Sequence, residues 1–320
     1  MDISIIIVSW NAKRFLLECL QSLGNGTLSH STELIVVDNG STDGSQDLIR
    51  QKFPHVKLIC NDTNLGFAKA NNIGIKESIG RYVCLVNSDV KVLEGCLDRL
   101  CNYMDQHRSI GIIGPKILWP DMTLQDSCRK FPTLWNNFCL SIGLQKAFPQ
   151  SELFSGEHMV YFPHDRICTV DSLVGCFLMV RREAIDQVGL LDERFFIYSE
   201  EVDWCKRLWN SGWEVVFFPG AQVIHYGRGS SSNAPLRFIL EQKRSILQYW
   251  RIHHGWLSQI AILSIFLFHH IGRMISGSFS YLIKPSKRAE VAQQIANDLA
   301  CIRFLLSLEK SRQSAIRNNK

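Results

Sequence analysis

The chain has 320 residues and a net charge of +5, and 46% of its residues are hydrophobic against 20% that are charged. This length and balance fit a large globular domain with an appendage and exclude a disordered chain. No arginine-rich cluster or basic-aromatic interleaving accompanies the mild charge, so the sequence does not indicate nucleic-acid binding. The charge suits a protein that binds anionic phosphates or an anionic membrane surface.

The cysteines and the N-terminal residues indicate the cellular compartment of the protein. Eleven cysteines are present without a CxxC pair, and an odd count with irregular spacing argues against a disulfide framework and a cysteine zinc site. Free thiols in a reducing cytosol are the simpler account. Residues 1–8 lack a basic segment and resemble a strand more than a signal peptide. We therefore expect a cytoplasmic protein.

The first hundred residues alternate between apolar runs and amphipathic stretches. Runs that are β-branched throughout indicate strands covered on both faces. We predict strands at Ile3–Val8, Leu34–Val37, Val56–Cys60 and Tyr82–Val86, and helices at Ala12–Leu23, Asp43–Lys52, Ala68–Ser78 and Glu94–Gln106. This repetition predicts an α/β fold with a mostly parallel sheet, helices on its faces and right-handed crossovers.

The rest of the chain is less regular. We expect loops and short helices over the binding site at Trp119–Val170, strands at Ser172–Arg181 and Glu214–Phe218, and helices at Arg182–Val188 and Glu200–Asn210. Gly229–Asn233 is a small, polar connector, and the sequence after it is helical in character. The sequence thus predicts a main domain at 1–228 and a helical extension at 229–320.

Within the extension, Ile252–Gly272 contains no Lys, Arg, Asp or Glu, but its dense apolar centre is only Ile260–Phe268. A spanning helix needs about 20 predominantly apolar residues. A helix that lies in the bilayer interface fits better, flanked by the basic residues Arg251, Arg273, Lys284, Lys287 and Arg288. A buried helix and a spanning helix are the alternatives. We expect peripheral membrane contact through residues 252–283, at the inner face of the cytoplasmic membrane.

Two aspartates lie just past the carboxyl ends of predicted strands, at the sheet edge where open α/β folds bind ligands. Asp38 begins a turn-rich polar loop, where a carboxylate can accept a hydrogen bond from a nucleobase N–H or can form an Asx turn. Asp89, in Asn87-Ser88-Asp89, is placed to bind Mg²⁺ or Mn²⁺, which prefer oxygen ligands and often bridge to phosphates.

Later segments add acids and a histidine. Glu200, Glu201 and Asp203 lie at one helix start, where they complement the helix dipole or supply a general base. Asp203 also lies four residues before Arg207, a spacing typical of an ion pair. His225 ends an apolar segment; it is either structural or a ligand that joins Asp89 on a transition metal.

In this order, the segments resemble glycosyltransferase family 2, which has the GT-A fold, and most closely its bacterial rhamnosyltransferase-like branch. The resemblance spans roughly residues 3 to 232. The stretches that carry it are Ile5–Asn11, Val37–Ser45, Asn64–Gly74, Leu85–Asp89, Gly111–Pro115, Gly175–Arg182, Phe195–Arg207 and Pro219–Ser231.

The resemblance implies a role for each matching residue. It places Ser9, Asn11 and Asp38 near the nucleotide base, and Asn64, Gly66 and Asn71 on the ribose and phosphate side. It places Asn87 and Asp89 in the metal motif, Glu201 at the catalytic base, Glu200 and Asp203 as supporting acids, and His225 on the metal. Asn87 stands where the family has an acid, and Glu201 where it favours Asp.

The resemblance implies an inverting transfer of a sugar from a nucleotide-diphosphate donor to an acceptor hydroxyl of a glycan or lipid-linked glycan, as in cell-surface polysaccharide synthesis. It favours dTDP-rhamnose as the donor, although UDP- and GDP-sugars fit the sequence as well. The alternatives are a sugar nucleotidyltransferase and a non-catalytic protein that binds a nucleotide sugar. The first would favour a glycine- and lysine-rich phosphate loop where this chain has Ser9-Trp10-Asn11.

Overall fold

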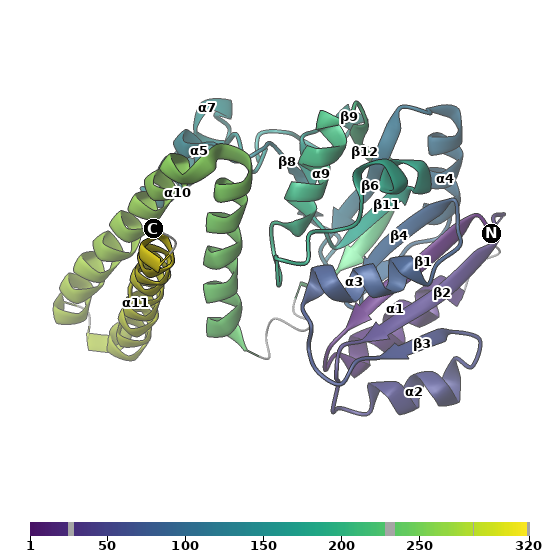
Figure 1. Cartoon of the computed structure of the whole chain (residues 1–320), viewed down its shortest axis with the longest axis horizontal. Helices are drawn as coiled ribbons and strands as arrows, with labels where there is room; N and C mark the ends of the chain where they lie inside the picture. Colours follow the sequence, from purple (N-terminus) through teal and green to yellow (C-terminus); the bar gives the residue numbers. More distant parts are fainter. Residues whose placement is uncertain (25–28, 228–233, 284, 319–320) are drawn as a thin grey trace. The chain divides into compact units, whose positions relative to one another are not determined.

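A computed structural model describes residues 1–24, 29–227, 234–283 and 285–318 (Figure 1). The chain forms two compact units. Unit 1 consists of Met1–Phe131 and Gly156–Pro235, and unit 2 consists of Pro132–Ser155 and Leu236–Lys320. The sequence predicted a boundary at 228/229, and this position and the connector Gly229–Asn233 lie outside the described residues. The short-helix segment 132–155, expected over the binding site, groups with unit 2.

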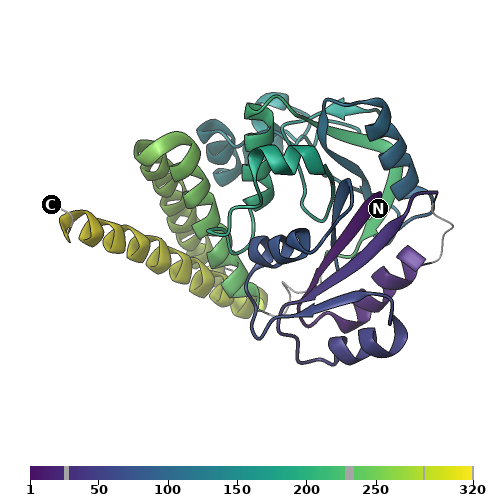
Figure 2. The same ribbon diagram turned by 45° about the vertical axis from the view of Figure 1, so that its right-hand side comes forward.

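Unit 1 is built on one mixed sheet, whose strands run in the order β3-β2-β1-β4-β11-β6-β12-β5. The strands are β1 Ile3–Ser9, β2 Thr32–Asp38, β3 Lys57–Cys60, β4 Tyr82–Asn87, β5 Val90–Val92, β6 Ile110–Leu118, β11 Phe177–Arg181 and β12 Glu214–His225. Neighbours are parallel from β3 to β4 and between β6 and β12, whereas β11 is antiparallel to both β4 and β6. Figures 1 and 2 show β1, β2 and β3 side by side.

The second half of the sheet departs from the prediction. The strand expected at 172–181 is two strands, β10 Ser172–Leu173 and β11, and β10 pairs with β8 Cys128–Arg129 outside the main sheet. Strand β12 continues past Phe218 to His225, with register shifts after Glu214 and Phe218. Strand β6 was not predicted from the sequence, because its glycines and Pro115 are residues typical of turns.

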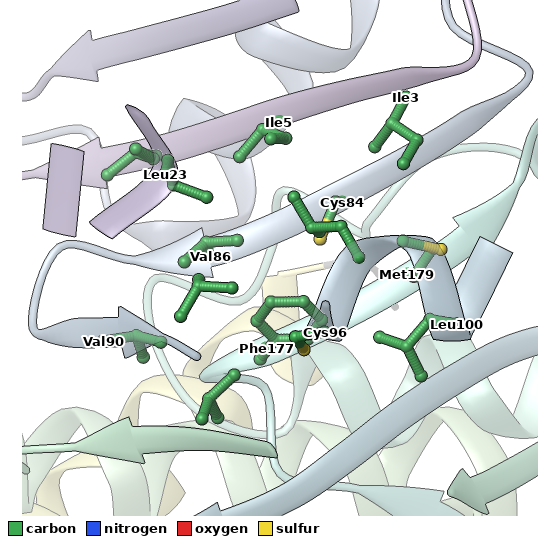
Figure 3. Close-up of a cluster of buried hydrophobic side chains, with 14 of the residues drawn as sticks. Ile3, Ile5, Leu23, Cys84, Val86, Val90, Cys96, Leu100, Phe177 and Met179 are labelled. Carbon is green, nitrogen blue, oxygen red and sulfur yellow. The ribbon is translucent and has the colours of Figure 1, made fainter. Parts of the chain in front are cut away.

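Alternate residues of the strands face opposite sides of the sheet. Ile3, Ile5 and Ile7 pack with α1 Lys13–Gly24, α2 Ser45–Lys52 and α4 Cys96–Gln106. Ile6 packs on the other side with α3 Phe67–Lys76, α8 Arg182–Val188 and α9 Glu200–Asn210. Figure 3 shows part of the first cluster, in which Phe177 and Met179 of β11 lie among residues of β1, β4 and α4. Both faces are buried, as the apolar runs predicted.

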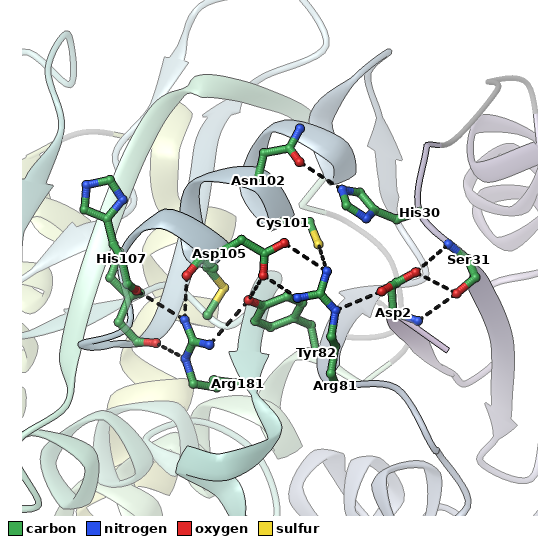
Figure 4. Close-up of polar contacts among 12 residues, drawn as sticks. Asp2, His30, Ser31, Arg81, Tyr82, Cys101, Asn102, Asp105, His107 and Arg181 are labelled. Atoms are coloured by element: carbon green, nitrogen blue, oxygen red, sulfur yellow. Dashed lines mark hydrogen bonds and ion pairs between the residues drawn. The ribbon is translucent and has the colours of Figure 1, made fainter.

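The amino-terminal edge of the sheet carries a polar network (Figure 4). The buried Arg181 guanidinium donates hydrogen bonds to the carbonyls of Met104, His107 and Ile110, and thereby satisfies the end of α4. Arg81 pairs with Asp2 and with Asp105. The charges of Arg81, Asp2 and Asp105 are therefore paired within the protein at this edge.

Unit 2 is helical. It contains α5 Leu134–Ser141, α6 Leu144–Ala147, α7 Glu152–Ser155, α10 Pro235–Ile283, the 3₁₀ turn η2 Pro285–Lys287 and α11 Arg288–Asn318. Helix α10 is kinked at Gly255, whose φ of 80° suits glycine. After the kink, Asp298 of α11 holds α10 through His270 at 2.8 Å and Arg273 at 3.2 Å.

Helix α10 exposes apolar side chains. Among the described residues it is the one helix long and apolar enough to cross a membrane, by length and composition alone. Its second half has a buried face that includes Ile262 and Phe266. Another set is exposed, and its successive members are three, four or eight residues apart: Leu257, Ile260, Phe268, Ile271, Ile275, Phe279 and Leu282. This stripe lies along one side of the helix.

Candidate active site

Polar side chains gather at the carboxyl edge of the sheet in unit 1. Strands β1, β2 and β4 are parallel and end at Ser9, Asp38 and Asn87. Strand β11 runs antiparallel to β4 and to β6, and β12 runs parallel to β6. Strand β12 therefore ends at His225 on the same edge as the other three. The short strand β5, which follows Asp89, pairs with this end of β12.

Ser9 and Asp38 are register partners on adjacent strands and both are fully buried. One carboxylate oxygen of Asp38, Oδ1, accepts hydrogen bonds from the Ser41 amide at 2.9 Å and the Gln46 side chain at 2.8 Å. The other oxygen, Oδ2, and the Ser9 hydroxyl have no hydrogen-bond partner in the described part of the chain. The turn thus uses Oδ1 of Asp38, and Oδ2 remains available to a ligand.

Asn11 and Asn39 form hydrogen bonds with the loops beside Ser9 and Asp38. Asn11 has a positive φ of 49°, and its side-chain oxygen accepts a hydrogen bond from the Thr42 amide at 2.7 Å. Asn39, which follows Asp38, donates to the side chain of Asn64 and the carbonyl of Gly66. Its own oxygen accepts from the Leu65 amide at 3.1 Å. Asn39 therefore links the β2 end to the loop before α3.

The three residues that the resemblance places on the ribose and phosphate side have partners within the protein. The Asn64 oxygen accepts from the Gly66 amide at 2.9 Å, and the Asn71 amide donates to the Phe67 carbonyl of its own helix. Gly66 lies so close to Phe196 that an added Cβ would stand 2.3 Å from the Phe196 carbonyl oxygen. These contacts therefore fix the conformation of the loop before α3 and of the first turns of that helix.

Asp89 and His225 meet at the sheet edge. The Nε2 atom of His225 lies 3.3 Å from Oδ1 of Asp89, and its Nδ1 atom lies 3.0 Å from Oε1 of Gln125. Burial lowers the pKa of His225, but the neighbouring Cys176 and Asp89 side chains outweigh it and raise the pKa to about 10. The imidazole is thus held on both sides.

The pair fits a divalent ion. Two cis ligands of an octahedral ion, each about 2.1 Å from it, lie about 3.0 Å apart, close to the observed spacing. The buried side-chain oxygen of Asn87 accepts no hydrogen bond from the described residues and is a further oxygen donor on this edge. Among the described residues, no three His, Cys, Asp or Glu side chains converge as a metal cluster.

Two glutamates begin α9. Burial raises the pKa of Glu201, and burial together with the Glu201 charge raises the pKa of Glu200 well above its usual value. The Oε2 atom of each is buried and has no hydrogen-bond partner among the described residues. The two preceding residues, Tyr198 and Ser199, have positive φ angles of 71° and 68°. Strained backbone of this kind persists where the surroundings impose it, and it often marks a functional site.

Asp203 differs from the two glutamates. Its carboxylate pairs with Arg207 at 2.8 Å, four residues later, and is buried. Arg207 also donates to the carbonyls of Val188 and Leu190, which tie α9 to the end of α8. The ion pair that the spacing predicted is present, and it gives Asp203 a packing role beside Glu201.

The segment between β10 and β11 connects the two halves of the site. Gly175 packs against the Glu201 side chain, with 3.4 Å from its ideal Cβ position to Cγ of Glu201. Cys176 follows, and its side chain interacts with His225. The Cys176 carbonyl accepts a hydrogen bond from the Asn87 amide at 2.9 Å. Glu201 and His225 therefore contact neighbouring residues of the segment 174–176.

Sequence reasoning did not single out Gln125 or Arg129. Gln125 lies in the two-residue strand β7 Leu124–Gln125, too short to give a periodic pattern. Arg129 lies in β8 and donates hydrogen bonds to backbone carbonyls, and its positive charge acts on Glu201. Both residues fall in the stretch that was expected to be irregular, and nothing in their spacing separates them from surface polar residues.

The model of the family described as glycosyl transferase family 2 matches residues 4–189. An N-acetylglucosaminyl-diphospho-decaprenol L-rhamnosyltransferase of Mycobacterium tuberculosis is 29% identical over 265 residues, which cover 79% of this chain and 85% of the relative. The dTDP-rhamnosyl transferase RfbF of Shigella flexneri is 25% identical over 259 residues, which cover 80% and 79%.

A solved structure shares the fold. GalNAc-T7 with UDP, GalNAc and Mn²⁺ superposes with a TM-score of 0.55 at 17% identity, over 70% of this chain and 44% of that chain. The GT-A fold predicted from the sequence is confirmed, and the C-terminal helical region is present as expected. With its family model over more than half its length, and rhamnosyltransferases among its relatives, the chain belongs to glycosyl transferase family 2.

Proposed function

We propose that the protein is a metal-dependent inverting glycosyltransferase that moves rhamnose from a nucleotide-diphosphate donor to a lipid-linked glycan. The observation that carries the proposal is the approach of His225 to Asp89 at 3.3 Å, with Glu201 across the segment 174–176. A pair that can bind a metal, with a carboxylate nearby that has one buried oxygen without a partner among the described residues, suits a reaction between a diphosphate sugar and a hydroxyl. The names of the relatives support rhamnose as the sugar.

The base of the donor would lie against Asp38 and Ser9. A buried carboxylate oxygen without a partner needs a donor, because leaving it unsatisfied costs about 1–3 kcal/mol. Uracil, thymine and guanine offer a ring N–H, and adenine and cytosine do not. This chemistry supports a UDP-, dTDP- or GDP-sugar, and Asn11 and Asn39 would hold the surrounding loops in place.

Asp89 and His225 would hold the divalent ion together with the donor diphosphate. An imidazole ligand favours Mn²⁺ over Mg²⁺, since Mg²⁺ prefers oxygen alone. When bound, the ion supplies positive charge beside the departing diphosphate. The family relationship supports a donor of this kind, and GalNAc-T7 is solved with Mn²⁺.

Glu201 would accept the proton of the acceptor hydroxyl as the oxygen attacks the anomeric carbon from the face opposite the nucleotide. The raised pKa of Glu201 makes it a stronger base than an exposed glutamate when it is ionised. Burial and the Glu201 charge raise the pKa of Glu200 well above its usual value, which favours the neutral form of Glu200 beside an ionised Glu201. Attack from the opposite face inverts the anomeric configuration.

The acceptor would lie at a membrane. The mycobacterial relative is named for a decaprenol diphosphate, and the exposed apolar stripe on α10 supports a helix that lies in the bilayer interface. Arg251 and Arg288, which flank this part of unit 2, suit anionic lipid. We therefore place the protein at the cytoplasmic face of the membrane, with peripheral contact through residues 252–283.

A donor screen tests the function directly. The purified chain with Mn²⁺ is incubated with dTDP-rhamnose, UDP-sugars or GDP-sugars and a lipid-diphosphate-sugar acceptor, and products are measured by mass spectrometry. The proposal predicts acceptor mass increased by one deoxyhexose and release of nucleoside diphosphate. Release of pyrophosphate from a sugar phosphate and a nucleoside triphosphate would favour a nucleotidyltransferase. Donor binding without any turnover would favour a non-catalytic protein.

A further inference from the structure

Gln125 lies behind His225, on the side away from Asp89. The Nδ1 atom of His225 is 3.0 Å from Oε1 of Gln125, while the Nε2 atom is 3.3 Å from Asp89. An amide oxygen only accepts hydrogen bonds, so Nδ1 must carry the proton in this contact. The other ring nitrogen is then the one available to a metal ion.

We propose that Gln125 is a positioning residue that keeps the proton of His225 on Nδ1 and directs Nε2 to the metal at Asp89. The proposal rests on the proposed function, since it takes His225 as a metal ligand. Metal-bound histidines in general donate their second N–H to an oxygen acceptor, which fixes the tautomer and the ring orientation.

The backbone around Gln125 is held firmly enough for this role. Gln125 pairs with Ile117 of β6, and the turn between the two strands is closed by two hydrogen bonds between Trp119 and its neighbours. The Trp119 amide donates to the Thr123 carbonyl at 2.8 Å, and the Met122 amide donates to the Trp119 carbonyl at 2.8 Å. Gln125 therefore projects from a short hairpin.

The same hairpin supports the chain just after His225. Gly227 has a φ of 65°, and a Cβ at this position would stand 2.9 Å from the Trp119 ring. On the other side, His225 pairs with Val90, and the Tyr226 amide donates to the Asp89 carbonyl at 3.0 Å. The backbone around His225 is thus held by the β6–β7 hairpin on one side and by Asp89 and Val90 on the other.

Two substitutions of Gln125 separate hydrogen bonding from packing. Gln125→Met keeps the length and removes the acceptor, whereas Gln125→Glu keeps the acceptor. Mn²⁺ affinity in the presence of UDP, measured by calorimetry, should fall about 10- to 100-fold in Gln125→Met and change little in Gln125→Glu, because outer partners of metal ligands carry effects of this size. Unchanged affinity in the Met variant, or an equal loss in both, would overturn the proposal.

Gln187 of α8 provides a matched control, because it is exposed and its Oε1 accepts a hydrogen bond from the ring N–H of Trp213 at 2.8 Å. Gln187→Met should bind Mn²⁺ like the parent. In a His225→Ala background, Gln125→Met should cause no further loss, since its effect passes through the imidazole. A full additional loss in the double variant would show that Gln125 acts without His225.

A spectroscopic measurement distinguishes a wrong role for Gln125 from the absence of a metal site. Nitrogen-15 NMR of histidine-labelled protein with UDP and diamagnetic Mg²⁺ reports which ring nitrogen of His225 is protonated. We expect Nδ1–H in the parent and in Gln125→Glu, and a changed signal in Gln125→Met. A proton on Nε2 in the parent overturns the positioning role. Absence of any divalent-ion binding by the parent overturns the metal site instead, and with it the role of His225 as a metal ligand.

Discussion

The Nε atom of Arg207 lies 2.8 Å from Oδ2 of Asp203, and this buried ion pair sets Asp203 apart from the two glutamates that precede it. Asp203→Asn should lower the free energy of unfolding by about 2–3 kcal/mol, because the Arg207 charge loses its partner. Denaturant unfolding measures this effect. Transfer by the folded fraction should stay within about threefold of the parent.

A large loss of kcat in Asp203→Asn at unchanged stability would give Asp203 a part in the reaction. Arg207→Met is the companion variant, since it removes the other half of the pair and also the bonds to Val188 and Leu190. It should destabilise the fold at least as much as Asp203→Asn does.

Glu201→Gln should lower kcat by about 10²–10⁴-fold, the usual contribution of a general base. Donor binding should change little, because the amide keeps the size of the side chain. Calorimetry with the nucleoside diphosphate and a single-turnover assay separate the two effects. Near-normal turnover in this variant would remove Glu201 from the role of base.

The pH dependence of kcat/KM should follow the ionisation of Glu201. Burial raises its pKa, and the base must be ionised, so activity falls as the pH decreases through a value above 4.5. The Arg129 charge lowers this pKa, so Arg129→Met should move the acidic limb to higher pH while Arg129→Lys restores it. An acidic limb at the same pH in Arg129→Met would contradict this account.

The apolar stripe on α10 should bind lipid. Replacing Ile275 and Phe279 by Glu places two charges on the exposed face and should reduce binding to anionic vesicles at least tenfold, by loss of about 1.5 kcal/mol or more of apolar burial per side chain. Ile79→Glu in unit 1, where Ile79 is also exposed, is the control. Equal vesicle binding by the parent and the double variant would contradict membrane contact through this face.

The sequence predicted the parallel half of the sheet well, because its strands are unbroken β-branched runs buried on both faces. The positions of Asp38 and Asp89 at strand ends followed from the same runs. Strand β6 was missed because Pro115 and its glycines mimic turn signals, and the antiparallel β11 reverses a direction that local pattern does not encode. Long-range pairing decides both features.

The site was less predictable at the level of single contacts. The order of motifs identified Asp89 and His225 together, although 136 positions of sequence separate them. By contrast, the amides of Asn64 and Asn71 bond to neighbouring backbone groups, and Gln125 supports His225 from a two-residue strand. The partner of a polar side chain depends on tertiary geometry, which residue type and spacing leave open.

The most direct test of the account asks whether Asp89 and His225 bind the same ion. Pulsed electron paramagnetic resonance of Mn²⁺ with UDP and the parent protein should show coupling to an imidazole nitrogen. His225→Ala should remove that coupling, and Asp89→Ala should weaken Mn²⁺ binding about tenfold or more. Mn²⁺ bound equally tightly by all three proteins, without nitrogen coupling in the parent, would contradict the account.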